Sequence, residues 1–265
     1  MDCNRVSLSV ATRAPTGQTA AYILGSDSAL LVDPAAVTDE LDDALADRTV
    51  DHVAVTHHHP DHVGAVERYA VAHDATVWCR YGRAADFEAA TGVAPDRTFV
   101  DGTTIPTADG EVTVVDTPGH APEHVGFRFA DDDIGGATAY LVGDLAVAAG
   151  SVVVGAPQGD MRAYVSSLRR LWARNPETLY PSHGPVIADP RETCARLIAH
   201  RRDREERVRR AVHDGARTVE EITDTAYEKD LSGVRDMAEA TVIAHLEKLA
   251  VEGHVHWDGA EATPV

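Results

Sequence analysis

The chain has 265 residues, 44% of them hydrophobic, a length that allows a large buried core and one or two domains. Its net charge of −19 argues against a strongly basic surface for nucleic acid. No run of about 18 apolar residues occurs, which excludes a membrane-spanning helix.

Apolar runs separated by turn residues predict strands at the start of the chain. Strands are expected over 6–10, 21–24 and 29–32, with a turn at 25–28. The third strand ends at Asp33, and a helix is expected over 38–46. The apolar residues Val53–Val55 then indicate the end of a buried strand.

The segment His57–His62 contains the pattern His-x-His-x-Asp-His. Neutral imidazole and carboxylate are ligands that suit zinc and similar divalent ions. Helical periodicity begins just after it, at Val63, Val66 and Ala70, so the cluster lies on a loop between a strand and a helix. A histidine tag would lie at a terminus and would lack the interposed Asp61.

Three further motifs follow later predicted strands. Thr117–His120 comes after a strand over 112–115, Leu141–Asp144 closes a strand over 139–142, and Tyr180–Pro185 contains His183. Strands are also expected over 76–79 and 125–129. Asp160 is expected to cap an amphipathic helix over 162–174. Its apolar face would be formed by Tyr164, Val165, Leu168, Leu171 and Trp172.

Together these motifs resemble those of the metallo-β-lactamase superfamily of hydrolases. The resemblance implies a first metal site of His57, His59 and His120, a second of Asp61, His62 and His183, and Asp144 bridging both. Two zinc ions are the first expectation, while iron or manganese also suit such mixed nitrogen and oxygen donors. In this family the metals lower the pKa of a shared water, and Asp61 would orient the resulting hydroxide or carry a proton.

The resemblance also implies an α/β fold, a four-layer αβ/βα sandwich over residues 1–193. Residues 194–265 differ in composition. An Arg- and Glu-rich helix is expected over 196–210, a second helix after the capping box Thr218–Glu221, a third over 237–251, and a strand over 254–257. Three helices and a strand pair describe a winged helix. This module resembles the C-terminal part of a branch that includes a mitochondrial endoribonuclease acting on single-stranded RNA.

The role of this C-terminal module stays open at the level of sequence. It has eleven Lys and Arg against fifteen Asp and Glu, a net charge of −4. Its arginines between Arg201 and Arg210 could meet phosphates, or could pair with Glu205 and Glu206 along an exposed helix. Forming one wall of the cleft, or the contact of a homodimer, is a further alternative.

Four other residues near the motifs have two interpretations each. His124 is either a partner of a metal ligand or a structural histidine, and Asp33 either holds the His57–His62 loop or serves a turn. His58 is expected to point away from the metals. Ser182 replaces the glycine usual before the last histidine in this branch, and His183 is still expected to reach its metal.

Three classes of function therefore compete. The first is a metal-dependent hydrolase of esters, thioesters or related small substrates, the second a nuclease that cuts single-stranded RNA at the same metals, and the third a non-catalytic metal- or nucleic-acid-binding protein. The full ligand set favours an enzyme. We expect a metallohydrolase with an unassigned small-molecule substrate, or single-stranded RNA as the alternative, and no membrane partner.

Two features predict the cellular setting. The first residues lack a secretory signal, and the dispersed Cys3, Cys79 and Cys194 do not form a disulfide framework, so a cytoplasmic protein is expected. Lys229 and Lys248 are the only lysines. Acidic, lysine-poor surfaces resemble those of extreme halophiles, in which salt screens the repulsion between carboxylates, although an ordinary acidic protein is the alternative.

Salt should therefore stabilise the fold. Raising KCl from about 0.1 M to about 1 M shortens the Debye length from about 10 Å to about 3 Å, so repulsion within the acidic chain should weaken. We expect the midpoint of thermal unfolding, followed by circular dichroism, to rise by several degrees. Sucrose at matched osmolality controls for exclusion effects. An unchanged or lowered midpoint in KCl would contradict the halophilic interpretation.

Overall fold

A computed structural model describes residues 1–265, and its internal contacts divide the chain into two compact units. The first unit comprises residues 1–116, 123–149 and 175–190, and the second comprises residues 117–122, 150–174 and 191–265. The domain division at residues 193 and 194 stays a prediction.

The first sheet of the first unit has six strands in chain order. They are β1 (Cys3–Ser9), β2 (Gln18–Leu24), β3 (Ala29–Val32), β4 (Val50–Ala54), β5 (Thr76–Arg80) and β6 (Arg97–Phe99). The pairs β1–β2 and β2–β3 are antiparallel, and the remaining pairs are parallel. Because β3 and β4 are parallel, their carboxyl ends lie at the same edge of the sheet.

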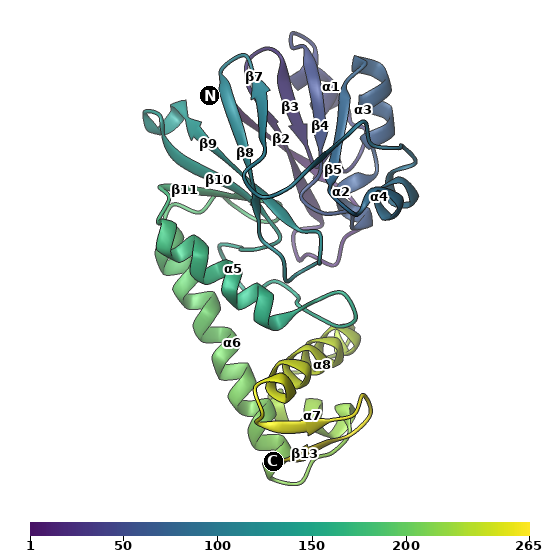
Figure 1. Ribbon diagram of the computed structural model, residues 1–265, viewed down its shortest axis with the longest axis vertical. Coiled ribbons are helices and arrows are strands. Elements are labelled where there is room, and N and C mark those ends of the chain that lie inside the picture. Colours follow the sequence, from purple (N-terminus) through teal and green to yellow (C-terminus); the bar gives the residue numbers. More distant parts are fainter. The chain divides into compact units, whose positions relative to one another are not determined.

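The helices of this unit connect the strands of the first sheet. They are α1 (Asp39–Leu45), α2 (Pro60–Val63), α3 (Val66–His73) and α4 (Ala84–Thr91). Figure 1 shows these helices along one face of that sheet. Apolar side chains of α1, α3 and α4, such as Leu41, Val66 and Phe87, form one core cluster with that face.

The second sheet has five strands in the order β11 (Thr178–Pro181), β10 (Ala137–Gly143), β9 (Val125–Asp131), β8 (Gly110–Asp116) and β7 (Thr104–Thr107). Only β10 and β11 are parallel. The acidic connection between β9 and β10 contains a short 3-10 helix, η1 (Asp132–Ile134). The antiparallel pairing of β9 and β10 confirms the strands predicted over 125–129 and 139–142.

The two sheets pack face to face through a second apolar cluster. Tyr22 and Leu30 of the first sheet share this cluster with Val112 and Phe127 of the second. In β2 the side chains alternate: Tyr22 and Leu24 belong to this cluster, and Ile23 between them belongs to the cluster on the helix side. Side chains thus alternate between two buried faces, as a sheet covered on both sides requires. Two mixed sheets packed in this way confirm the predicted α/β sandwich.

The second unit contains the remaining elements. They are α5 (Met161–Arg174), α6 (Pro190–His213), α7 (Val219–Ala226), α8 (Arg235–Val251) and the hairpin of β12 (Val255–Trp257) and β13 (Ala262–Pro264). Helices α6, α7 and α8 and the hairpin enclose one small core that includes Val212, Ile222, Leu246 and Val255. Figure 1 shows the hairpin beside α7 and α8, as expected of a winged helix.

Local signals in the sequence place most of these elements within a few residues. Asp160 accepts hydrogen bonds from the backbone N–H groups of Arg162 and Ala163, as a helix cap does, and Thr218 and Glu221 form the predicted capping box. The prediction that Trp172 lies on the buried face of α5 is wrong. Trp172 is 38% exposed and is covered by the guanidinium of Arg191 at 4.2 Å from the ring centroid.

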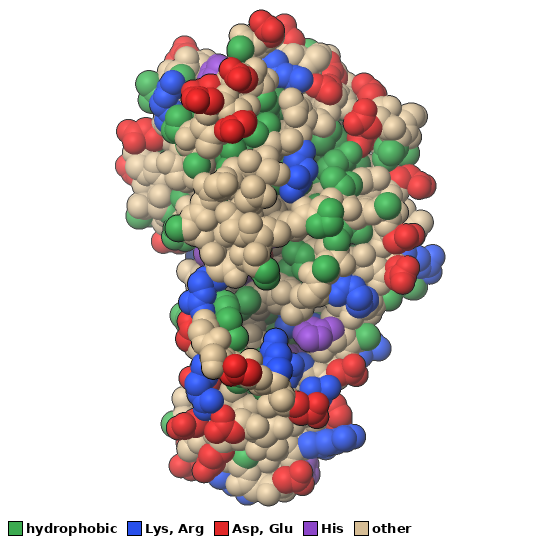
Figure 2. All heavy atoms as spheres, turned by 180° about the vertical axis from the view of Figure 1, so that it is seen from behind, with side chains coloured by type: hydrophobic (Ala, Val, Ile, Leu, Met, Phe, Trp, Pro, Cys, Tyr) green, Lys and Arg blue, Asp and Glu red, His purple; other side chains and the backbone are tan.

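The surface matches the acidic composition. Figure 2 shows one face on which carboxylate side chains are spread widely and basic side chains lie among them. None of the helices is both long and apolar enough to span a bilayer.

Candidate metal centre

The loop after β4 presents the predicted ligands of the first unit. β4 ends at Ala54, and the one-turn helix α2 begins at Pro60, whose fixed φ suits the first helical position. The turn places Asp61 and His62 next to each other in the cluster. Gly64 follows directly, and a Cβ atom there would lie 2.4 Å from the carbonyl oxygen of Ala35. Only glycine allows the end of α2 to pack this closely on the segment that follows β3.

Asp33 holds this loop in place through hydrogen bonds. It lies at the end of β3, has no exposed surface and adopts a left-handed backbone conformation with φ of 52°. Its carboxylate accepts hydrogen bonds from Thr56 N at 2.7 Å, Thr56 Oγ1 at 2.8 Å, His62 Nδ1 at 3.0 Å and Ser182 Oγ at 3.2 Å. Of the two interpretations given to Asp33, holding the loop is therefore the correct one.

His62 is held with its other nitrogen directed at the cluster. Its Nδ1 faces Asp33, and its buried Nε2 has no hydrogen-bond partner. This Nε2 lies 3.9 Å from Asp61 Oδ1 and 3.9 Å from Asp144 Oδ1. Burial lowers the pKa of His62, but the charges of Asp33, Asp144 and Asp61 and the hydrogen bond to Asp33 outweigh it and raise that pKa to about 9.

His57 and His59 meet through one nitrogen each. His57 Nε2 lies 2.9 Å from His59 Nδ1. Thr56 Oγ1 donates its hydrogen to Asp33, so it can accept a hydrogen bond from the Nδ1–H of His57 at 3.0 Å. The tautomer of His57 that follows carries its lone pair on Nε2, the nitrogen that faces His59.

Asp144 and His183 come from the ends of β10 and β11. His183 Nδ1 lies 2.8 Å from the carbonyl oxygen of Gln18, which leaves Nε2 to face Asp144 Oδ1 at 3.3 Å and Asp61 Oδ2 at 3.8 Å. Burial lowers the pKa of His183, but its hydrogen bond with Asp144 and the charge of that carboxylate raise it overall. The protein therefore favours a cation at this position.

His124 supports Asp144 through the backbone. The N–H of Asp144 donates to His124 Nε2 at 3.0 Å, so that nitrogen carries no proton. A Cβ atom on Gly143 would lie 2.6 Å from the same Nε2 and 2.9 Å from Thr56 Cβ. His124 is thus a fully buried partner of a predicted ligand.

His120 belongs to the second unit, on the loop 117–122 after β8. Its Nδ1 lies 2.7 Å from the carbonyl oxygen of Val153. That contact makes Nε2 the ring nitrogen suited to a metal. The role of His120 as third ligand of the first site stays a prediction.

The residues brought together in the first unit fit a divalent metal. The ligand atoms of His57, His62 and Asp144 lie within 4.8 Å of one another, and so do those of Asp61, His62 and His183. His62 Nε2 is buried and makes no hydrogen bond, and burying a polar atom without a partner costs free energy. A metal ion coordinated by this nitrogen would supply the missing partner. Imidazole nitrogens oriented by a carboxylate and a carbonyl are typical of histidine ligands to metals.

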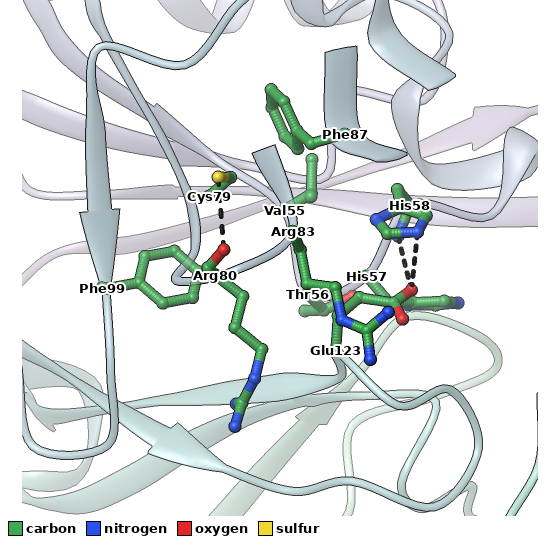
Figure 3. Close-up of a pocket in the computed structure, with 10 residues that line it drawn as sticks. All are labelled: Val55, Thr56, His57, His58, Cys79, Arg80, Arg83, Phe87, Phe99 and Glu123. Carbon is green, nitrogen blue, oxygen red and sulfur yellow. Dashed lines mark hydrogen bonds and ion pairs between the residues drawn. The ribbon is translucent and has the colours of Figure 1, made fainter. Parts of the chain in front are cut away.

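A small hollow lies behind the ligand loop, on the side of His58. Figure 3 shows Glu123 reaching His58, whose Nε2 lies 3.3 Å from Glu123 Oε1. The hollow is lined on its other side by Phe87 and Phe99. Its cavity volume of about 10 Å³ leaves room for about one water molecule, so it does not provide a substrate site. His58 points away from the ligand cluster, as predicted.

Two side chains of the site have no signal in the sequence. Thr12 Oγ1 donates to Asp61 Oδ2 at 2.6 Å from the loop after β1, and Glu123 holds His58. Neither residue lies in a motif. Each makes its contact with a segment far away in the sequence, so no local pattern indicates it. Ser182, expected to serve only as a small residue, donates its hydroxyl to Asp33.

Comparisons with known proteins agree with this geometry. Residues 14–183 match the metallo-beta-lactamase superfamily, and residues 218–262 match the beta-lactamase associated winged helix domain. A metallo-beta-lactamase family protein from Thermus thermophilus, solved by crystallography, aligns with 99% of this chain and 98% of its own at 24% identity and a TM-score of 0.78.

Two curated relatives are named as hydrolases. The chain is 34% identical over 213 residues to a hydroxyacylglutathione hydrolase of Methylococcus capsulatus, covering 75% of this chain and 74% of the relative. It is 30% identical over 162 residues to a thioesterase of Emericella nidulans. That match covers 61% of this chain but only 42% of the thioesterase.

Replacing Asp33 should weaken the second metal site. Asparagine also tolerates the left-handed conformation, so Asp33→Asn removes mainly the charge and one acceptor. We expect the affinity for zinc to fall about 10- to 100-fold, as measured by competition with a chelator. The exposed Asp47→Asn serves as the matched control. If Asp33→Asn binds two zinc ions as tightly as that control, Asp33 does not orient a ligand.

Zinc binding should depend on pH through His62. Because the pKa of His62 is raised to about 9 in the metal-free protein, the ring is protonated at neutral pH and a proton must leave when Nε2 takes a metal. The dissociation constant for zinc should therefore fall about tenfold per pH unit as pH rises toward that pKa, and then level off. Chelator competition at several pH values measures it, and a pH-independent constant would contradict the protonated state.

Proposed function

Because the chain belongs to the metallo-β-lactamase superfamily, we propose that this hydrolase cleaves ester or thioester bonds of small molecules at a dinuclear metal centre. The observation that carries the proposal is the buried cluster around His62, in which ring nitrogens and carboxylates converge and one nitrogen lacks a hydrogen bond.

The proposed ligands divide into two sets. His57, His59 and His120 would hold one ion, Asp61, His62 and His183 the other, and Asp144 would lie between both. Two bound divalent ions would lower the pKa of water toward neutrality and polarise a carbonyl or phosphoryl oxygen. Zinc suits this donor set, and iron or manganese are alternatives.

Asp61 is the residue to which we assign a catalytic role besides metal binding. Thr12 fixes one of its carboxylate oxygens, Oδ2, while Oδ1 faces His62 Nε2. A carboxylate held in one orientation can accept a proton from an attacking water or pass it to a leaving group. Thr12 then acts as a positioning residue for that carboxylate.

Ester and thioester substrates are supported by the relatives. A thioesterase and a hydroxyacylglutathione hydrolase both act on acyl groups joined to sulfur, as their names state. Since the chain spans less than half of the thioesterase, a shared substrate is part of the proposal and does not follow from the match alone.

Single-stranded RNA is the second candidate, favoured by the winged-helix match at residues 218–262. The interactions of the arginines on α6 argue against RNA binding. Arg209 and Arg210 both pair with Glu206, Arg201 is buried, and Arg204 stacks 3.5 Å above the centroid of the Tyr227 ring. Few arginines of this helix therefore remain for phosphates.

The two candidates can be separated with one metal-loaded preparation in molar KCl. We expect hydrolysis of a panel of acyl thioesters and aryl esters, and no cleavage of a labelled single-stranded RNA. The His59→Ala variant controls for contaminating enzymes, since true activity must vanish with a ligand. RNA cleavage that vanishes in the control, without ester hydrolysis, would overturn the proposed substrate class.

Asp144 should be needed for a complete dinuclear centre. Asp144→Ala removes the carboxylate placed between the two ligand sets, so we expect about one bound metal in place of two and a loss of kcat/KM of at least about 100-fold. Metal content by mass spectrometry and the ester assay measure these effects. Two bound metals with undiminished activity would refute the bridging role.

A further inference from the structure

The loop that carries His120 is built into the second unit. Asp160 N donates to the carbonyl oxygen of Gly119 at 2.8 Å, and Ser167 Oγ donates to that of Pro118 at 2.9 Å. Gly119 has φ of 137°, and a Cβ atom there would lie 2.3 Å from Tyr164 Cα. The loop therefore rests directly on the first turns of α5.

The ring of His120 is oriented by a second loop of the same unit. Its Nδ1 lies 2.7 Å from the carbonyl oxygen of Val153, within residues 150–160. A carbonyl that accepts from one ring nitrogen fixes the tautomer and the direction of the other. The position of the Val153 carbonyl therefore sets where His120 Nε2 points.

The C-terminal helices hold this second loop on both sides of Val153. From α6, Arg201 donates to the carbonyl of Val152 and Arg196 to that of Gly150 at 2.6 Å. From α8, the carbonyl of Ala240 accepts from Ala156 N at 3.0 Å. The loop makes these contacts with helices that lie outside the family match at residues 14–183.

Arg201 is an unusual residue to find in this position. It is only 4% exposed, and its guanidinium lies 5.2 Å from the centroid of the Tyr164 ring. Burying a guanidinium is costly unless it makes strong hydrogen bonds and stacks on an aromatic ring. From α6, Arg201 thus contacts both Tyr164 of α5 and the carbonyl of Val152. Val152 directly precedes Val153, whose carbonyl orients His120.

Gly155 provides an independent way to disturb the same loop. A Cβ atom on Gly155 would lie 2.8 Å from Ala240 Cβ and 3.3 Å from the Ala240 carbonyl carbon. An added methyl would push the loop away from α8 without changing any charge.

We propose that the C-terminal helices are a positioning element of the metal centre, acting on His120 through Arg201 and the Val153 carbonyl. The inference rests on the proposed function, in which His120 is a ligand of the first site. Loosening these contacts should weaken that site and spare the second, whose ligands lie in the first unit. The winged-helix region would then serve hydrolysis of every substrate, including the smallest esters.

The test is zinc binding by the full-length protein, measured by competition with a chromophoric chelator. Arg201→Met should raise the dissociation constant of one zinc ion by about tenfold or more and leave the other unchanged. Arg201→Lys, which can still donate to the Val152 carbonyl, should restore most of the affinity. Arg202→Met, an exposed neighbour on α6, is the matched control and should bind zinc like the wild type.

A double variant separates positioning from general destabilisation. In a His59→Ala background, where the first site is already lost, Arg201→Met should not weaken the remaining zinc ion. Gly155→Ala should reproduce the loss of affinity, and it keeps the test decisive if Arg201→Met does not fold. Wild-type affinity for both ions in the variants that fold would overturn this inference and leave the proposed function standing. A wild-type protein that binds none of zinc, iron and manganese would overturn both.

Discussion

A carboxylate that is fully removed from water must be compensated by hydrogen bonds or by positive charge. Asp33 meets that requirement with four donors, which come from the loop after β4, the helix α2 and the end of β11. Losing the Thr56 N–H would leave the buried Oδ1 without a hydrogen bond, at a cost of about 1–3 kcal/mol, while the other three donors share Oδ2. The strand ends are therefore held in the one arrangement that brings the ligands together.

This constraint extends from Asp33 to the individual rings. His62 is oriented by Asp33 directly, and His57 through the hydroxyl of Thr56. His183 is oriented by a backbone carbonyl of β2. Each ring uses one nitrogen for the protein, so the other can serve a cation. A centre held this way needs little rearrangement when metal binds, although protons must leave.

The second unit contains one of the predicted ligands, His120. His120 is carried by a loop seated on α5 and oriented by a carbonyl that α6 and α8 hold in place. The charge pattern of α6 fits such a structural role, because several of its arginines are buried, stacked or paired within the chain.

The candidate metal ligands stand out in the sequence because they lie in short motifs directly after strands, where chemistry and local structure coincide. Periodicity and capping signals also locate the long helices and most strands. The roles of Asp33, His124 and Thr12 are decided only by the tertiary structure. Their contacts span 23 residues from Asp33 to Thr56, 20 from His124 to Asp144 and 49 from Thr12 to Asp61. No local pattern encodes such pairs, since the packing of two sheets and the helices brings them within hydrogen-bond distance.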